Sequence, residues 1–151
     1  MNKRQINFKL IDHFNSELSR WGVIRLKDNE LANRFLEYTK DSPSNIEFMI
    51  EHDLLLTVFF YDREMQPNKW RLYGGMCWRY ELESGKAAYG IGISKQTIER
   101  GKRKTVEMFL HECAHALHGV DHRAHDERFH DLLKVLVDEY NKANGTNYNS
   151  N

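Results

Sequence analysis

Residues 105–118 carry the clearest structural signal in this chain. They read Thr105-Val106-Glu107-Met108-Phe109-Leu110-His111-Glu112-Cys113-Ala114-His115-Ala116-Leu117-His118. Apolar residues recur there at intervals of three and four, which is the period of one face of an α-helix. They are Val106, Phe109, Leu110, Cys113, Ala114 and Leu117. At about 100° per residue, His111 and His115 fall away from this apolar stripe. The stretch therefore predicts an amphipathic helix with two imidazoles on the face that the core does not use.

His111, Glu112 and His115 form the pattern H-E-x-x-H. In a helix the two histidines stand one turn apart, about 6 Å along the axis, so both can bind one metal ion. Neutral imidazole suits Zn²⁺, and a catalytic zinc ion commonly has three protein ligands and a water whose pKa falls to about 7. Glu112 lies beside the pair, where it can act as general base toward that water and then as acid toward the leaving amine. The competing interpretation is a helix with solvated histidines.

A third metal ligand has to come from the residues after this helix. The candidates are His118, Asp121, His122, His125, Asp126, Glu127 and His130. A second helical pattern follows, at Phe129, Leu132, Leu133, Leu136, Val137 and Tyr140. Extended backward, this pattern places His125 inside the apolar stripe that faces the first helix, and His130 at the margin of the stripe. His125 is therefore the predicted third ligand.

Two other histidines compete with His125. His122 follows His115 at nearly the spacing of the metzincin pattern H-E-x-x-H-x-x-G-x-x-H, but it and Gly119 each come one residue late. No methionine follows Met108 to form a Met-turn, which also argues against a metzincin. His118 falls on the polar side of the first helix, where it is either solvated, which we favour, or placed beside the metal ligands without binding the ion.

The remaining residues predict an α+β fold with about four to five helices around a small sheet. Residues 54–61, 70–80 and 87–94 are rich in β-forming residues, and a turn at residues 83–86 separates the last two, so we expect a small sheet that contains antiparallel strands. Glycine weakens a strand, so Gly74-Gly75 and Gly90 to Gly92 predict either a bulge or a ligand-facing strand. Helical spacing from Ile6 to Trp21 and from Leu31 to Tyr38 predicts two covering helices, a loop is expected at residues 41–45, and Gly145 marks the end of the last helix.

The composition fits one neutral domain. The chain has 151 residues, 22 basic and 22 acidic side chains, and two cysteines, which is too few for a disulfide framework. We expect a single domain over 1–151, with a helical part at 1–50, the sheet at 54–94 and the metal-site helices at 95–144. No stretch resembles a signal peptide or a membrane span, so a cytoplasmic location is expected. Of the eight histidines, six lie between His111 and His130, which indicates where the function resides.

From Trp70 onward the sequence resembles the SprT-like zinc metalloproteases, the family of bacterial SprT and of the DNA-protein crosslink protease Spartan. The resemblance rests on the glycine-containing strand at 73–78, the strand at 91–94, the run 103–110 that leads into the H-E-x-x-H helix, and the tail from Asn141 to Asn147. The most specific element is 125–129, which looks like the family's H-G-x-x-F segment, although Asp126 replaces the glycine. The resemblance implies a zincin-like fold, the zinc ligands His111, His115 and His125, and Glu112 as the catalytic acid and base.

Two functions follow as hypotheses. The first is a zinc-dependent endopeptidase that hydrolyses peptide bonds through a zinc-activated water and holds its protein or peptide substrate along Ala87 to Ile93, taken as an edge strand. The family suggests DNA-associated protein substrates, as in DNA-protein crosslink repair. The basic residues near the site are Lys95, Arg100, Lys102, Arg103 and Lys104. Zero net charge does not indicate DNA binding, which stays open. The second hypothesis is a non-proteolytic, zinc-stabilised DNA-associated or regulatory module.

Overall fold

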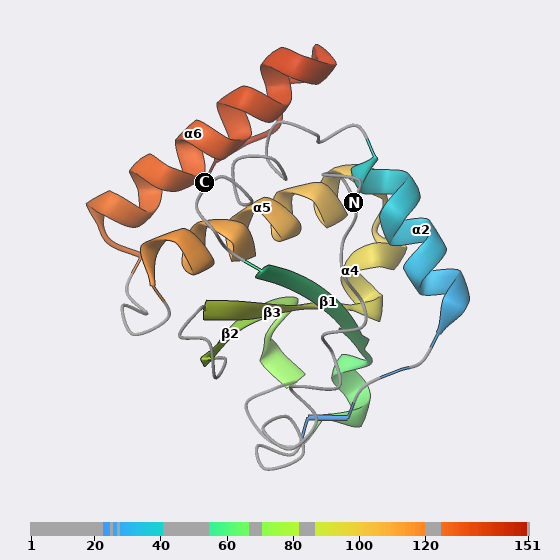
Figure 1. The fold of residues 1–151 in the computed structure, drawn as a ribbon. Helices are drawn as coiled ribbons and strands as arrows, with labels where there is room; N and C mark the ends of the chain where they lie inside the picture. The colour runs from blue at the N-terminus through green and yellow to red at the C-terminus, as the bar shows by residue number, and fades with distance from the viewer. Residues whose placement is uncertain are drawn as a thin grey trace.

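Figure 1 shows the chain as a computed structural model that describes residues 23–24, 26, 28–40, 55–66, 71–81, 87–119 and 125–150. Within these ranges the fold is α+β, as predicted. The elements in chain order are α2 (Asn29–Thr39), β1 (Leu55–Tyr61), the short 3₁₀ helix η2 (Arg63–Met65), β2 (Gly75–Glu81), β3 (Ala87–Ser94), α4 (Lys95–Glu99), α5 (Lys102–His118) and α6 (Glu127–Asn144). The helix expected between Ile6 and Trp21 and the loop at 41–45 lie outside the described residues.

The three strands form one mixed sheet in the order β1-β3-β2. β2 pairs with β3 antiparallel, as predicted, and β1 pairs with β3 parallel, so the antiparallel pair lies in a mixed sheet. The prediction that Ala87 to Ile93 is an edge strand is wrong, because β3 has a hydrogen-bonded partner on each side. Every residue from Tyr89 to Ser94 is buried, as expected for a central strand. The edges of the described sheet are β1 and β2.

Gly92 lies in β3 because neighbouring side chains occupy the space that a Cβ atom needs. A Cβ built there would stand 2.6 Å from the Phe59 ring in β1 and 2.7 Å from Met76 Cγ in β2. The pairing registers on both sides of β3 run without interruption, so this glycine marks no bulge. The strand interior instead needs glycine for close side-chain packing.

The helices form two layers above the sheet. α5 packs against β2 and β3 on one side and against α6 on the other, so it is the middle layer (Figure 1). Phe109 of α5 meets Phe35 of α2 edge-to-face, with ring centroids 5.3 Å apart, and Phe35 meets Phe60 of β1 in the same way at 5.7 Å. These aromatic contacts join the helices to the sheet in one apolar core. Among the described helices, none has the length and apolar character needed to cross a membrane.

Local signals fix the ends of the two long helices. α5 lies between Gly101 and Gly119, which both have positive φ angles, 104° and 99°. α6 begins at the N-cap Asp126, whose side chain accepts a hydrogen bond from the Phe129 amide. It ends at Gly145 in the left-handed conformation, so the predicted stop is confirmed. Residues at both ends of α5 and α6 thus set where the two helices that flank the candidate site begin and end.

Candidate metal centre

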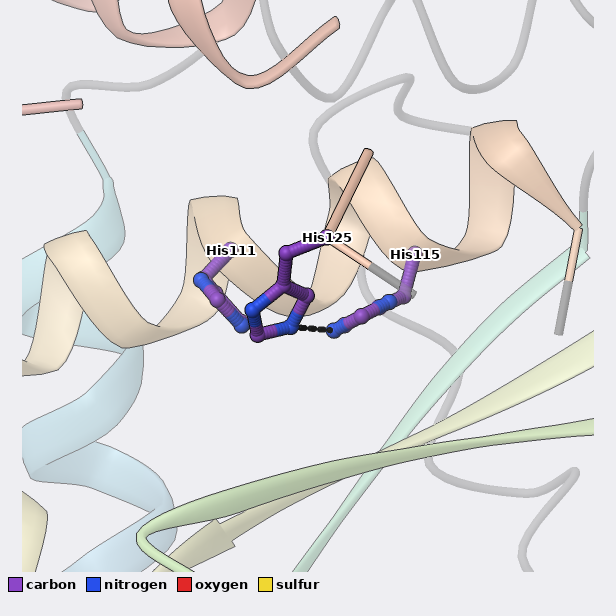
Figure 2. A group of neighbouring side chains, drawn as sticks. All are labelled: His111, His115 and His125. Carbon is purple, nitrogen blue, oxygen red and sulfur yellow. Dashed lines mark hydrogen bonds between the residues drawn. The ribbon is translucent and has the colours of Figure 1, made fainter. Parts of the chain in front are cut away.

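Three histidines from two parts of the chain converge at the junction of α5 and α6. His111 and His115 lie one turn apart in α5, and His125 lies directly before α6. One ring nitrogen of each lies within 4.8 Å of the others, and His125 Nε2 is 3.2 Å from His115 Nε2 (Figure 2). In a tetrahedral shell with zinc–nitrogen bonds of about 2.0–2.1 Å, ligand nitrogens stand roughly 3.3–3.4 Å apart. The histidine trio His111, His115 and His125 can therefore hold one metal ion.

A buried phenylalanine of α6 contacts all three members of the histidine trio. The Phe129 ring, which is fully buried, lies with its centroid 5.0 Å from His111, 4.5 Å from His115 and 4.6 Å from His125. It stacks on His125 at an interplanar angle of 20°. Contacts with one rigid apolar ring restrict how each imidazole can turn. The sequence contains this residue in the predicted stripe of α6, but its contact with all three histidines was not predicted.

Burial keeps two of the imidazoles neutral. Desolvation lowers the pKa of His111 and of His115 to about 4, and the neighbouring histidines add to the effect. A histidine must be neutral to bind a metal ion through its ring nitrogen. The expectation that these residues stand on a face away from the core needs one correction, because α6 covers that face and leaves both side chains half-buried. The covering helix accounts for the lowered pKa values.

Glu112 occupies a different position from its two histidine neighbours. Its side chain is buried between α5 and the sheet, and a Cβ atom built on Gly75 of β2 would stand 3.2 Å from Glu112 Cγ. Burial raises the pKa of its carboxyl group to about 8. Within the described part of the chain, no group donates a hydrogen bond to this carboxylate. In metal-free protein the carboxyl group therefore exchanges its proton near pH 8, close to the neutral range in which a general acid and base works best.

His118 is buried, so the favoured prediction that it is solvated is wrong, and the alternative of a residue beside the metal ligands remains. His118 Nε2 lies 3.1 Å from Oδ1 of Asp126, the N-cap of α6. The pair joins the two elements that carry the histidine trio. In the sequence, an aspartate three residues before Phe129 indicates the N-cap of a helix. Local spacing does not indicate that this aspartate also contacts His118.

The other candidate ligands differ in outcome. Asp126 uses its carboxylate to cap α6 and to contact His118, and Glu127 and His130 are exposed and lie outside the group. Asp121 and His122 lie outside the described residues. Among the candidates that the structure describes, His125 is thus the one that joins His111 and His115.

The basic residues near the site do not act as one group. Arg103 Nε and Lys104 Nζ lie 3.5 Å and 3.8 Å from the Glu107 carboxylate. The Arg103 guanidinium also lies over the Tyr148 ring, 5.3 Å from its centroid. Lys95 is half-buried, whereas Arg100 and Lys102 are exposed. Part of the positive charge is therefore used within the fold.

No protein-family model, no curated protein and no solved structure matches this chain.

Proposed function

We propose that the protein is a zinc-dependent endopeptidase with a zincin-like, SprT-type catalytic domain. The observation that carries the proposal is the convergence of the histidine trio next to the buried Glu112. Three neutral imidazoles are a common ligand set of catalytic zinc, which leaves one coordination position for water or substrate. A structural zinc site would need a fourth protein ligand, and the described residues supply three.

The donor set fits Zn²⁺, with His111, His115 and His125 as the residues that would hold it. A bound zinc ion would lower the pKa of a water to about 7 and polarise a peptide carbonyl group. The protein supplies the proton transfers. Glu112 takes a proton from the attacking water and delivers it to the nitrogen of the leaving amine. Its burial is suited to this exchange, because a pKa near the working pH allows both steps.

We place the substrate along β2 rather than along β3. β2 is an edge of the described sheet, so its outer backbone groups can pair with an extended peptide. Gly75 begins this strand directly beside Met108 and Glu112 of α5. A peptide added to β2 would thus run past the catalytic carboxylate. DNA-associated proteins as substrates, DNA itself as a further partner and a cytoplasmic location are parts of the proposal suggested by the resemblance.

The deciding experiment compares the wild-type protein with Glu112→Gln. Cleavage of casein by the zinc-loaded variant should fall by at least about 100-fold, the usual effect of losing a general acid and base. Zinc content should stay unchanged, because glutamine leaves all three imidazoles in place. Equal cleavage by the two proteins would refute the role of Glu112.

A non-proteolytic, zinc-stabilised DNA-associated or regulatory module is the alternative. The position of the trio favours it in one respect, since an ion there would join α5 to the start of α6. This alternative predicts that chelation unfolds the protein and that the zinc-loaded protein cleaves no casein, with or without single-stranded DNA. Cleavage that depends on zinc and on Glu112 would exclude it.

A further inference from the structure

A cavity of about 300 Å³ lies directly beside the histidine trio and shares His111 with it. Lys104, Glu107 and Met108 line it from the N-terminal half of α5, together with His111. Arg100 contributes from the end of α4 and Leu133 from α6. The volume is at the lower end for ligand pockets, so the cavity suits one side chain or one chain terminus.

The acidic residue in this lining is already neutralised. The Glu107 carboxylate lies 3.5 Å from Arg103 Nε and 3.8 Å from Lys104 Nζ. It also accepts a hydrogen bond from the Asn149 backbone amide at 3.1 Å. Glu107 therefore has little capacity to attract a cationic ligand, and it does not cancel the charge of Arg100.

Arg100 lines the cavity, and no carboxylate among the described residues forms an ion pair with it. The Arg100 side chain is exposed at the end of α4. The neighbouring helix α5 begins at Lys102 without a side-chain cap, so its positive dipole end adds to the charge there. Arg100, with Lys104 beside it, gives the cavity a surplus of positive charge.

The other lining residues explain how an acidic side chain would fit. Leu133 is buried and Met108 half-buried, and they offer apolar surface to a short aliphatic stem. A planar guanidinium binds a carboxylate through two parallel hydrogen bonds. His111 places this arrangement next to the reacting peptide bond. Resting on the proposed function, we propose that the cavity is a carboxylate-binding subsite that selects peptides with an acidic side chain beside the scissile bond.

Peptide binding tests this inference without requiring cleavage. The protein is the zinc-loaded Glu112→Gln variant, and the probes are three short peptides of matched sequence. The first is acetylated and amidated and contains one Glu, the second contains Gln in its place, and the third contains Gln but ends in a free carboxylate. Titration calorimetry should give at least about tenfold tighter binding for the Glu peptide than for the neutral one, as one charge-assisted hydrogen bond predicts. Tighter binding of the third peptide than of the first would overturn the inference, because the cavity would then select a chain terminus rather than an acidic side chain.

Two further variants assign the preference to a residue. Adding Arg100→Gln should reduce the preference to within about twofold. Lys102→Gln is the matched control, because it removes one exposed charge in the first turn of α5 outside the cavity lining, and it should leave the preference intact. Equal affinity for all three peptides would overturn the inference. So would a carboxylate preference that survives Arg100→Gln, since the carboxylate would then be binding the metal ion or the general surface charge.

Failure of the subsite and failure of the proteolytic function give different results. If wild-type protein cleaves casein but the three peptides bind equally, the endopeptidase proposal stands and the subsite is wrong. If Arg100 governs carboxylate binding but no protein is cleaved, the cavity binds carboxylates and the proteolytic proposal is wrong.

Discussion

The two faces of α5 differ in what their side chains contact. On one face, Val106, Phe109 and Leu110 are fully buried against the sheet and α2. On the other, His111 and His115 are half-buried and face His125 and the Phe129 ring. The first face contributes close packing to the fold, and the second presents nitrogen atoms that bind nothing in the core. We therefore expect that substitutions on the first face change stability and that substitutions on the second change metal binding.

The largest expected effect is on the packed face. Phe109→Ala should lower the free energy of unfolding by about 3–5 kcal/mol, because it leaves a cavity where Phe109 meets Phe35. Urea denaturation of the chelator-treated protein measures this. Zinc affinity of the folded variant should change less than about threefold, because no member of the histidine trio loses a contact.

Val135→Ala is the control for this prediction. Val135 is 45% exposed on α6, so its truncation should change the free energy of unfolding by less than about 0.5 kcal/mol. An equally small effect of Phe109→Ala would show that the packed face of α5 does not stabilise the fold.

The histidine face should show the opposite pattern. His125→Ala should weaken zinc binding by more than about 100-fold, since even partners that only orient a ligand are commonly worth 10–100-fold. His130→Ala is the matched control, because it is an exposed histidine near the start of the same helix and outside the trio. It should change zinc affinity less than about threefold. Competition with a chromophoric chelator measures both.

Zinc binding retained in His125→Ala but lost in His122→Ala would identify His122 as the third ligand. A large loss of stability in chelator-treated His125→Ala would contradict the difference between the two faces of α5. This exposed side chain would then contribute to packing as well as to metal binding.

Local spacing was sufficient to predict the elements that carry the metal centre. The helical period predicts α5 and α6. The apolar stripe of α6, extended backward along the sequence, predicts His125 as the third ligand. Both inferences depend on residues close in sequence, where the period of a helix fixes which side chains share a face.

Contacts between distant residues could not be predicted in the same way. β3 is central because β1 pairs with it across a long stretch of sequence, and strand alternation does not specify the partner. His118 is buried and lies 3.1 Å from Asp126 at the start of the next helix, a contact that the period of α5 alone does not specify. Gly92 needs the space taken by Phe59 and Met76, so the choice between a bulge and close packing depended on two neighbouring strands.

The smallest predicted effect is a pH dependence of stability that comes from Glu112. It tests whether this residue belongs to the packed face of α5 or to the histidine face. In metal-free protein, burial raises its pKa from 4.5 to about 8, so the folded state keeps a proton that the unfolded state releases. The stability from this carboxyl group is fully present below pH 4.5 and is lost as pH rises through 8. His111 and His115 act in the opposite direction, but their contribution changes only as pH falls from 6.5 toward 4.

Between pH 6.5 and 8, Glu112 is therefore the member of this group whose contribution changes. The free energy of unfolding of chelator-treated wild-type protein should fall by up to about 1.4 kcal/mol per pH unit in this window relative to Glu112→Gln. Urea denaturation at several pH values measures the difference between the two proteins, which cancels the other titrating groups. Parallel curves would mean that the carboxylate is solvated like the surface of the helix. A wild-type curve that falls away from the Glu112→Gln curve as pH rises would mean that α5 buries the Glu112 carboxyl group on the packed face, one residue away from His111.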